Sequence, residues 1–393
     1  MIDFSDNVKK LSSIFKKNGY EFYAVGGAVR DMILGKTPDD IDFCTNATPE
    51  EMLCLFPSSI KTGIKHGTLT IPFKHEFYEV TTYRIDGKYS DGRHPDSIEY
   101  SPNLKEDLSR RDFTINALAA DVETKEITDL FNGIKDIKDK RIRTVGEANL
   151  RFSEDALRML RAIRFEAKLG FSIEKNTMDA IKSNAPLIRR VSKERIFAEF
   201  VKTITSEHRN DAVKSLSTSG LWEEVLPSVP NRIVTMNKGC FTQSSSLASF
   251  FILTNTPHNG ISDTLSNLKT SNALKYDVLH LAESYTLFIN NTPKNDYQKR
   301  RFISFVQKEY INDFFDVLQT IGEYEPLLKK EYFEMLKYPL SIKELNINGN
   351  DLIGLGYNGI EIKNTLNSVL DEVLKNPEIN TKEKLLLFAG KHR

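Results

Sequence analysis

The chain has 393 residues, and its 54 Lys and Arg are balanced by 54 Asp and Glu. This length predicts two to four domains, and the zero net charge provides no overall positive field for a nucleic-acid partner. The charge is uneven, because residues 1–140 carry 19 basic against 24 acidic side chains whereas residues 141–202 carry 14 against 8. A basic segment therefore directly follows an acidic one, and a chance fluctuation is the alternative explanation.

Cysteine and hydropathy patterns exclude secreted and membrane classes. Cys44, Cys54 and Cys240 have neither metal-ligand spacing nor the even number of a disulfide framework, which indicates a reducing compartment. The N-terminal segment carries acidic residues, unlike a signal peptide, and no apolar run approaches membrane-spanning length. We therefore expect a soluble cytoplasmic protein with no membrane partner.

The beginning of the chain alternates helix and strand signals, which predicts a small α/β domain. Helices are expected over residues 4–18, 29–34 and 49–56, and strands over 22–25, 40–44, 68–73 and 77–83. Gly26 and Gly27 follow the first strand and, lacking Cβ atoms, allow backbone N–H groups to approach a phosphate beside a helix N-terminus. Arg30 lies one turn into that helix, where its guanidinium can fork onto phosphate oxygens. We predict nucleotide contacts for Gly27 and Arg30.

Two carboxylates, Asp40 and Asp42, follow one residue apart. In a strand both would extend from one face, where they repel each other unless a cation lies between them. Hard oxygen ligands beside a triphosphate site indicate Mg²⁺, so we predict Asp40 and Asp42 as catalytic metal ligands. A polar turn is the alternative, and it would be favoured without the preceding Gly-Gly-x-x-Arg-Asp. Glu79 is left open between a third acidic site residue and a structural partner of Arg84.

The motif GGAVRD followed by DDIDF resembles the opening motif of class II tRNA nucleotidyltransferases, the bacterial CCA-adding enzymes and their poly(A) polymerase relatives. RRDFTINAL, from Arg110 onward, also resembles a family motif, which implies a triphosphate or sugar contact for Arg111 and supporting roles for Asp112 and Asn116. The polar segment 85–96 contains an Asp-Gly-Arg-x-Pro element. In the family a similar element is associated with completing the terminal adenosine, which favours addition of A; an ordinary hairpin connection is the alternative.

From Ser153, the run SEDALRMLRAIRFEAKLGF predicts one helix with Ser153 as N-cap and Gly170 as its stop. Asp155, Arg158 and Arg161 would form one ridge that Arg164 continues. A carboxylate that accepts from an exocyclic amine, next to an arginine that donates to a ring nitrogen, would admit C and A and reject U and G. A solvated face of ion pairs is the alternative. The resemblance to the family's EDxxRxxR motif implies base reading by Asp155 and Arg158, and nucleotide or phosphate contacts for Arg161 and Arg164.

The remainder is predicted to be helical. Within the basic amphipathic helix 187–202, the residues Arg189, Arg190, Lys193 and Arg195 either contact RNA phosphate or brace the base-reading helix, and the sequence does not choose between these roles. The fold class expected is α+β: an α/β head of the polymerase-β-like nucleotidyltransferase type, then an all-α neck, body and tail. The expected domains are a head over 1–143, a base-reading neck over 144–206, and a tRNA-binding body and tail over 207–393.

The function implied by the resemblance is addition of C, C and A to a tRNA 3′ end from CTP and ATP, with Mg²⁺ and without a nucleic-acid template. The expected partners are the tRNA acceptor arm and the two nucleotides. Three alternatives stay open: an enzyme that adds only A to tRNA ending in CC, a poly(A) polymerase, and a non-catalytic RNA-binding module.

Overall fold

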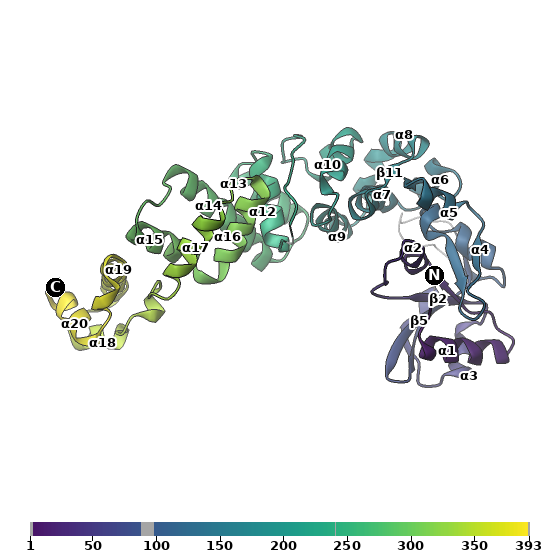
Figure 1. Ribbon diagram of the computed structural model, residues 1–393, viewed down its shortest axis with the longest axis horizontal. Coiled ribbons are helices and arrows are strands. Elements are labelled where there is room, and N and C mark those ends of the chain that lie inside the picture. The colour runs from purple at the N-terminus through teal and green to yellow at the C-terminus, as the bar shows by residue number, and fades with distance from the viewer. Residues whose placement is uncertain (1–2, 88–97, 240, 392–393) are drawn as a thin grey trace. The chain divides into compact units, whose positions relative to one another are not determined.

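A computed structural model describes residues 3–87, 98–239 and 241–391 (Figure 1). It divides into two compact units, residues 1–226 and 227–393, each of which is described by itself. The predicted Asp-Gly-Arg-x-Pro element at 91–95 lies outside the described residues. The finer domain boundaries expected at 143 and 206 stay predictions.

A seven-stranded mixed sheet forms the centre of the head, in the order β3-β4-β5-β2-β1-β8-β9. All neighbours are antiparallel except β2 and β5, which run parallel. The sheet strands are β1 (Tyr23–Val25), β2 (Asp42–Thr45), β3 (Ile60–Gly63), β4 (Thr68–Phe73), β5 (Glu76–Thr82), β8 (Leu118–Asp121) and β9 (Ile127–Asp129). The head helices are α1 (Asp6–Lys17), α2 (Gly27–Ile33), α3 (Pro49–Leu55), α4 (Leu104–Ser109) and α5 (Gly133–Lys138). A separate two-stranded antiparallel sheet pairs β6 (Arg84–Asp86) with β7 (Ile98–Tyr100).

Successive side chains of β2 point to opposite faces of the sheet, and each face has its own buried cluster. Phe43 stacks on Phe22, with ring centroids 4.8 Å apart, and Phe22 stacks in turn on Phe15 of α1 at the same spacing. Cys44 extends to the opposite face and joins a second buried cluster that includes Tyr83. Since side chains alternate in a strand, Asp42 lies on the Cys44 face, at the exposed start of β2.

Helices form most of the rest of the first unit, and they depart from the sequence prediction at two points. They are α6 (Ala148–Glu154), α7 (Leu157–Leu169), α8 (Lys175–Asn184), α9 (Lys193–Ile204), α10 (Arg209–Thr218) and α11 (Leu221–Val225), and β10 (Arg141–Ile142) pairs in parallel with β11 (Ser172–Ile173). The helix predicted over 187–202 is interrupted, because Val191 and Ser192 are extended: Ala185–Arg190 forms a 3₁₀ helix, and an α-helix begins only at Lys193. The predicted stop at Gly170 is confirmed, because this residue ends α7 with a φ of 67°.

The predicted start of the base-reading helix at Ser153 is wrong. Ser153 lies inside α6, where its hydroxyl donates to the carbonyl of Leu150 rather than capping a helix. Asp155 adopts an extended conformation between α6 and α7, and its carboxylate accepts the N–H of Leu157, so a side chain replaces a helical backbone bond. Asp155 therefore does not belong to a helical ridge with Arg158.

The described part of the second unit is helical. Its helices are α12 (Gln243–Leu253), α13 (His258–Asn267), α14 (Asn272–Asn290), α15 (Asp296–Val306), α16 (Ile311–Ile321), α17 (Pro326–Met335), α18 (Gly349–Gly354), α19 (Ile360–Lys375) and α20 (Lys382–Lys391). An aromatic core joins Phe288, Phe302, Phe314 and Tyr332. Across the described residues, none of the helices has the length and apolarity needed to cross a bilayer. A mixed-sheet head followed by helices confirms the predicted fold class.

Candidate nucleotide-binding site

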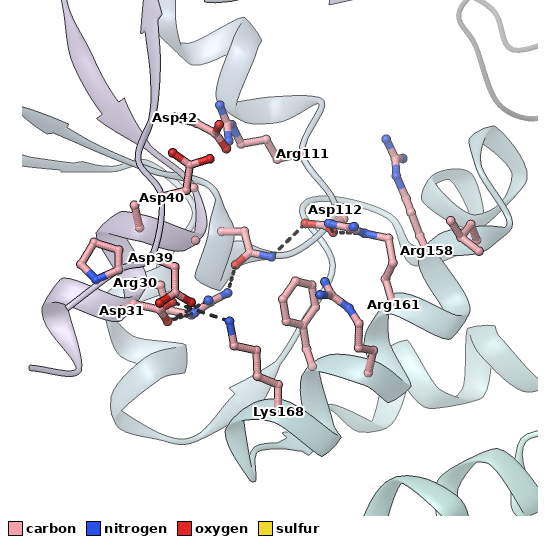
Figure 2. A pocket seen from close by; sticks show the side chains of 18 of the residues that line it. Arg30, Asp31, Asp39, Asp40, Asp42, Arg111, Asp112, Arg158, Arg161 and Lys168 are labelled. Carbon is pink, nitrogen blue, oxygen red and sulfur yellow. Dashed lines mark hydrogen bonds and ion pairs between the residues drawn. The ribbon is translucent and has the colours of Figure 1, made fainter. Parts of the chain in front are cut away.

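One cavity of about 540 Å³ in the first unit brings the predicted site residues together. Its walls come from α2, the start of β2, the segment 110–116, α7 and α9. All nine residues predicted from the sequence line it, namely Gly27, Arg30, Asp40, Asp42, Arg111, Asp155, Arg158, Arg161 and Arg164. In Figure 2 the aspartates at the start of β2 lie on one side of this space and the arginines of α7 on the other.

Asp40 and Asp42 form the acidic edge of the cavity, and their side chains lie side by side (Figure 2). The strand begins at Asp42, so Asp40 belongs to the preceding loop rather than to the strand. Desolvation in the cavity raises the pKa of Asp42, and the negative charge of Asp40 raises it further against the opposing effect of Arg111. Neither aspartate forms an ion pair with a basic side chain among the described residues. A bound cation would relieve the repulsion between these two carboxylates, which Arg111 offsets only in part.

The donor set fits a hard divalent cation that takes its other ligands from substrate or water. Two carboxylates supply the oxygen ligands that such ions prefer. In the described ranges, no group of three or more His, Cys, Asp or Glu side chains is placed to hold a metal. Glu79 is exposed on β5, and its neighbour Val80 pairs with Phe43, so Glu79 extends from the same sheet face as Asp42. It does not line the cavity.

The turn before α2 brings backbone close to Arg111. Gly26 has a φ of 75° and a ψ of −135°, a conformation reserved almost entirely for glycine. A Cβ atom there would lie 3.0 Å from Nη1 of Arg111. Arg111 is held in turn by the buried Asp107, at 3.1 Å. The glycine thus lets the N-terminus of α2 and a guanidinium share one edge of the cavity.

A series of hydrogen bonds, buried except at Arg161, connects α2 to α7 (Figure 2). Arg30 donates to Oδ1 of Asn116 at 2.5 Å, and Asn116 donates to Asp112 at 3.2 Å. Asp112 accepts from Arg161 at 2.6 and 2.8 Å. Burial alone would raise the pKa of Asp112, but the charge of Arg161 and these hydrogen bonds outweigh burial and lower it. These hydrogen bonds fix the positions of Arg30 and Arg161 relative to each other.

Asp155 and Arg158 both line the cavity; the N–H of Arg158 donates to the backbone carbonyl of Asp155 at 3.0 Å, and their side chains bond to other protein groups. One oxygen of Asp155 accepts from the N–H of Leu157 at 3.0 Å and the other from Arg195 at 2.7 Å. Arg158 donates to Glu154 at 2.5 Å and to the carbonyls of Arg151 and Arg110 at 3.1 and 3.0 Å. Both side chains are therefore held by protein groups, and their base-reading role stays a prediction.

Phe165 and Lys168 are among the cavity residues that the sequence prediction missed. Phe165 lies beneath the guanidinium of Arg164, 4.1 Å from its ring centroid, and burial lowers the pKa of Arg164. Lys168 reaches the far end of the cavity, 3.9 Å from Asp31. Both lie one turn beyond predicted arginines, so extending the Arg161 and Arg164 positions by four residues would have found them.

Comparisons with known proteins identify the family. Residues 22–143 match the Poly A polymerase head domain, and residues 170–232 match the probable RNA and SrmB-binding site of polymerase A. The CCA-adding enzyme of Lactobacillus helveticus is 40% identical over 365 residues, which cover 91% of this chain and 89% of that protein. The chain belongs to the family of CCA-adding enzymes. The CCA-adding enzyme of Oceanobacillus iheyensis is also similar, with 38% identity over 349 residues that cover 86% of this chain and 84% of that protein.

A solved member of the family supports the fold along the whole chain. The CCA-adding enzyme of Bacillus stearothermophilus, determined in complex with CTP, has a TM-score of 0.83 at 28% identity and covers 99% of this chain and 98% of that one. CCA-adding enzymes are nucleotidyltransferases that generally use a divalent metal ion. The resemblance and the enzyme class predicted from the sequence are therefore confirmed.

Proposed function

We propose that this protein is a CCA tRNA nucleotidyltransferase, which adds C, C and A to the 3′ end of tRNA from CTP and ATP without a nucleic-acid template. The observation that carries this proposal is the single cavity shared by Asp40 and Asp42 with Asp155 and Arg158. An acidic pair suited to phosphoryl chemistry thus lies in the same space as a carboxylate and a guanidinium suited to base recognition. Membership of the CCA-adding family supports the same reaction.

In the reaction, the terminal 3′ oxygen of tRNA forms a bond to the α-phosphorus of CTP or ATP, and the bond from that phosphorus to the leaving pyrophosphate breaks. Asp40 and Asp42 would hold the divalent ion, for which we propose Mg²⁺. When bound, this ion would lower the pKa of the 3′-hydroxyl and offset negative charge on the phosphates. Gly27, Arg30 and Arg111 would orient the triphosphate along the edge formed by the start of α2.

Base selection follows from the hydrogen-bonding groups of the four nucleotides. Cytosine and adenine each present an exocyclic amine beside a ring nitrogen acceptor, which complements the carboxylate of Asp155 and the guanidinium of Arg158. Uracil and guanine present a carbonyl and a ring N–H there, so acceptor would face acceptor and donor would face donor. An unpaired buried polar group costs about 1–3 kcal/mol, so two mismatches exclude U and G effectively.

The RNA partner would be bound mainly outside this cavity. We propose that the helices of residues 207–393 hold the tRNA acceptor arm through its shape and phosphates. We propose that the reaction takes place in the cytoplasm, which a tRNA substrate and nucleoside triphosphates support.

Product length tests the proposal directly. Purified protein is incubated with tRNA ending at the discriminator base, CTP, ATP and Mg²⁺, and we expect a product longer by three nucleotides. No product unless CC is already present would instead indicate an A-adding enzyme, and an open-ended ladder a poly(A) polymerase.

A variant separates catalysis from RNA binding. Asp42→Asn should bind tRNA as the parent does but lose at least about 10³-fold in incorporation, because it removes one of the two charges that hold the ion. If the parent itself never consumes CTP or ATP, the non-catalytic RNA-binding alternative is correct.

A further inference from the structure

The side chain of Asp155 is aimed by two protein groups of different origin. Its backbone is extended, with φ −138° and ψ 102°, between the end of α6 and the start of α7. One carboxylate oxygen is held locally by the N–H of Leu157, two residues away. The other accepts from Nη2 of Arg195, which comes from α9, forty residues later. The backbone of Asp155 caps the end of α6, and these two bonds hold its carboxylate.

Helix α9 supports a second cavity side chain in the same way. Glu199 lies four residues after Arg195, hence on the same face of α9. It pairs with Arg164 at 2.7 Å and lies 3.9 Å from Arg161. Glu199 is buried, and Arg195 lines the cavity beside Asp155. Two side chains on one face of α9 therefore contact the cavity residues: Arg195 contacts Asp155, and Glu199 contacts Arg164 and Arg161.

We propose that Arg195 is a positioning residue that determines nucleotide selectivity by fixing the Asp155 carboxylate as an acceptor toward the incoming base. This inference rests on the proposed base-reading function. Of the two roles that the sequence left open for Arg195, its 2.7 Å contact favours bracing over a phosphate contact.

The physical basis is that rejection of a wrong base needs a group that cannot move away. With both oxygens held, each retains a remaining lone pair that can accept from the amine of cytosine or adenine. The carbonyl of uracil or guanine meets an oxygen that has no proton to offer and no freedom to turn. Without Arg195, only the Leu157 bond remains, so the carboxylate can rotate and the penalty against the wrong base falls. Selectivity should be lost chiefly through faster use of wrong nucleotides.

The test compares kcat/KM for CTP and UTP on tRNA that lacks its CCA end. We expect Arg195→Met to lower the CTP-to-UTP ratio about tenfold or more, equivalent to about 1.4 kcal/mol of transition-state discrimination. Arg195→Lys, which retains a charged donor, should restore most of the ratio. Arg189→Met serves as the matched control: it also removes an arginine–carboxylate pair, with Glu224, but Arg189 is exposed and neither residue lines the cavity. Its ratio should equal that of the parent.

A double variant shows whether Arg195 acts through Asp155. Adding Arg195→Met to Asp155→Ala should leave the ratio where Asp155→Ala alone sets it. An unchanged CTP-to-UTP ratio in Arg195→Met, with any loss shared equally by the two nucleotides, would overturn the inference. So would an Arg195→Lys ratio no higher than that of Arg195→Met. If Arg195→Met does not fold, Arg195→Gln is measured under the same expectation, since glutamine has one neutral donor. A parent that incorporates UTP as readily as CTP would instead refute the proposed function.

Discussion

The ion pair between Asp112 and Arg161 joins the segment 110–116 to α7. The variant Asp112→Asn tests how much this ion pair contributes to stability. Asparagine has nearly the same shape, and its oxygen can still accept from the N–H of Phe113 and from Asn116, as Asp112 does at 2.8 and 3.2 Å. Its amide nitrogen then faces Arg161, so two guanidinium bonds of 2.6 and 2.8 Å are replaced by a contact between donors.

The expected loss is about 2–3 kcal/mol in the free energy of unfolding. Breaking a buried ion pair costs about 3–5 kcal/mol, and the Asp112 side chain is only 9% exposed. The loss should be smaller here, because the Arg161 side chain is 34% exposed to water and Glu199 remains 3.9 Å away. Asp139→Asn is the control: its carboxylate lies 3.9 Å from Arg141 with both side chains exposed, so its loss should be about 0.5 kcal/mol or less.

Urea unfolding followed by tryptophan fluorescence measures this loss in the correct unit. The sequence contains a single tryptophan, Trp222, which is buried within residues 1–226. Its signal therefore reports the first unit. If Asp112→Asn is no more destabilised than Asp139→Asn, the Asp112–Arg161 pair does not hold the segment 110–116 to α7, and the reasoning is refuted.

Two further predictions concern the glycine turn and pH. Gly26→Ala should raise the KM for CTP and ATP, because its new Cβ would lie 3.0 Å from Nη1 of Arg111. The control is Gly35→Ala, which is also at positive φ but would have no atom within 4 Å of its Cβ, so it should lose only stability. Equal KM values for the two variants would contradict this. The pKa values of Asp107 and Asp112 are lowered in the folded state, since neighbouring arginines outweigh burial. The stability that they contribute is therefore present above about pH 4 and is lost as pH falls through their folded pKa values. Trp222 unfolding curves should accordingly show a shallower acid dependence for Asp112→Asn than for the parent, and parallel curves would count against it.

The parts of the site that the sequence predicted are those encoded in short, contiguous motifs. The glycine turn, Asp40 and Asp42, and the α7 arginines each follow from local chemistry, and all line one cavity in the structure. Hydrophobic periodicity predicted the strands and helices that flank these motifs. A small α/β head followed by helices could therefore also be predicted.

What the sequence could not supply depends on contacts between distant segments. The pair of Asp155 with Arg195 joins residues forty apart, and helical periodicity assigned Asp155 to a helix because a side-chain bond that interrupts a helix leaves no periodic signal. Phe165 was not singled out from the sequence, and the fold places its ring beneath Arg164. The division of the chain after Leu226 likewise arises from tertiary contacts.

The most direct test of the account measures kcat/KM for all four nucleoside triphosphates with the parent and with Arg158→Ala. Arg158 also holds the carbonyls of Arg110 and Arg151, so its removal should slow every nucleotide to some extent. If Arg158 reads the base, CTP and ATP should lose far more than UTP and GTP, and the variant's preference should approach none. Equal losses for all four nucleotides would contradict base selection by Asp155 and Arg158.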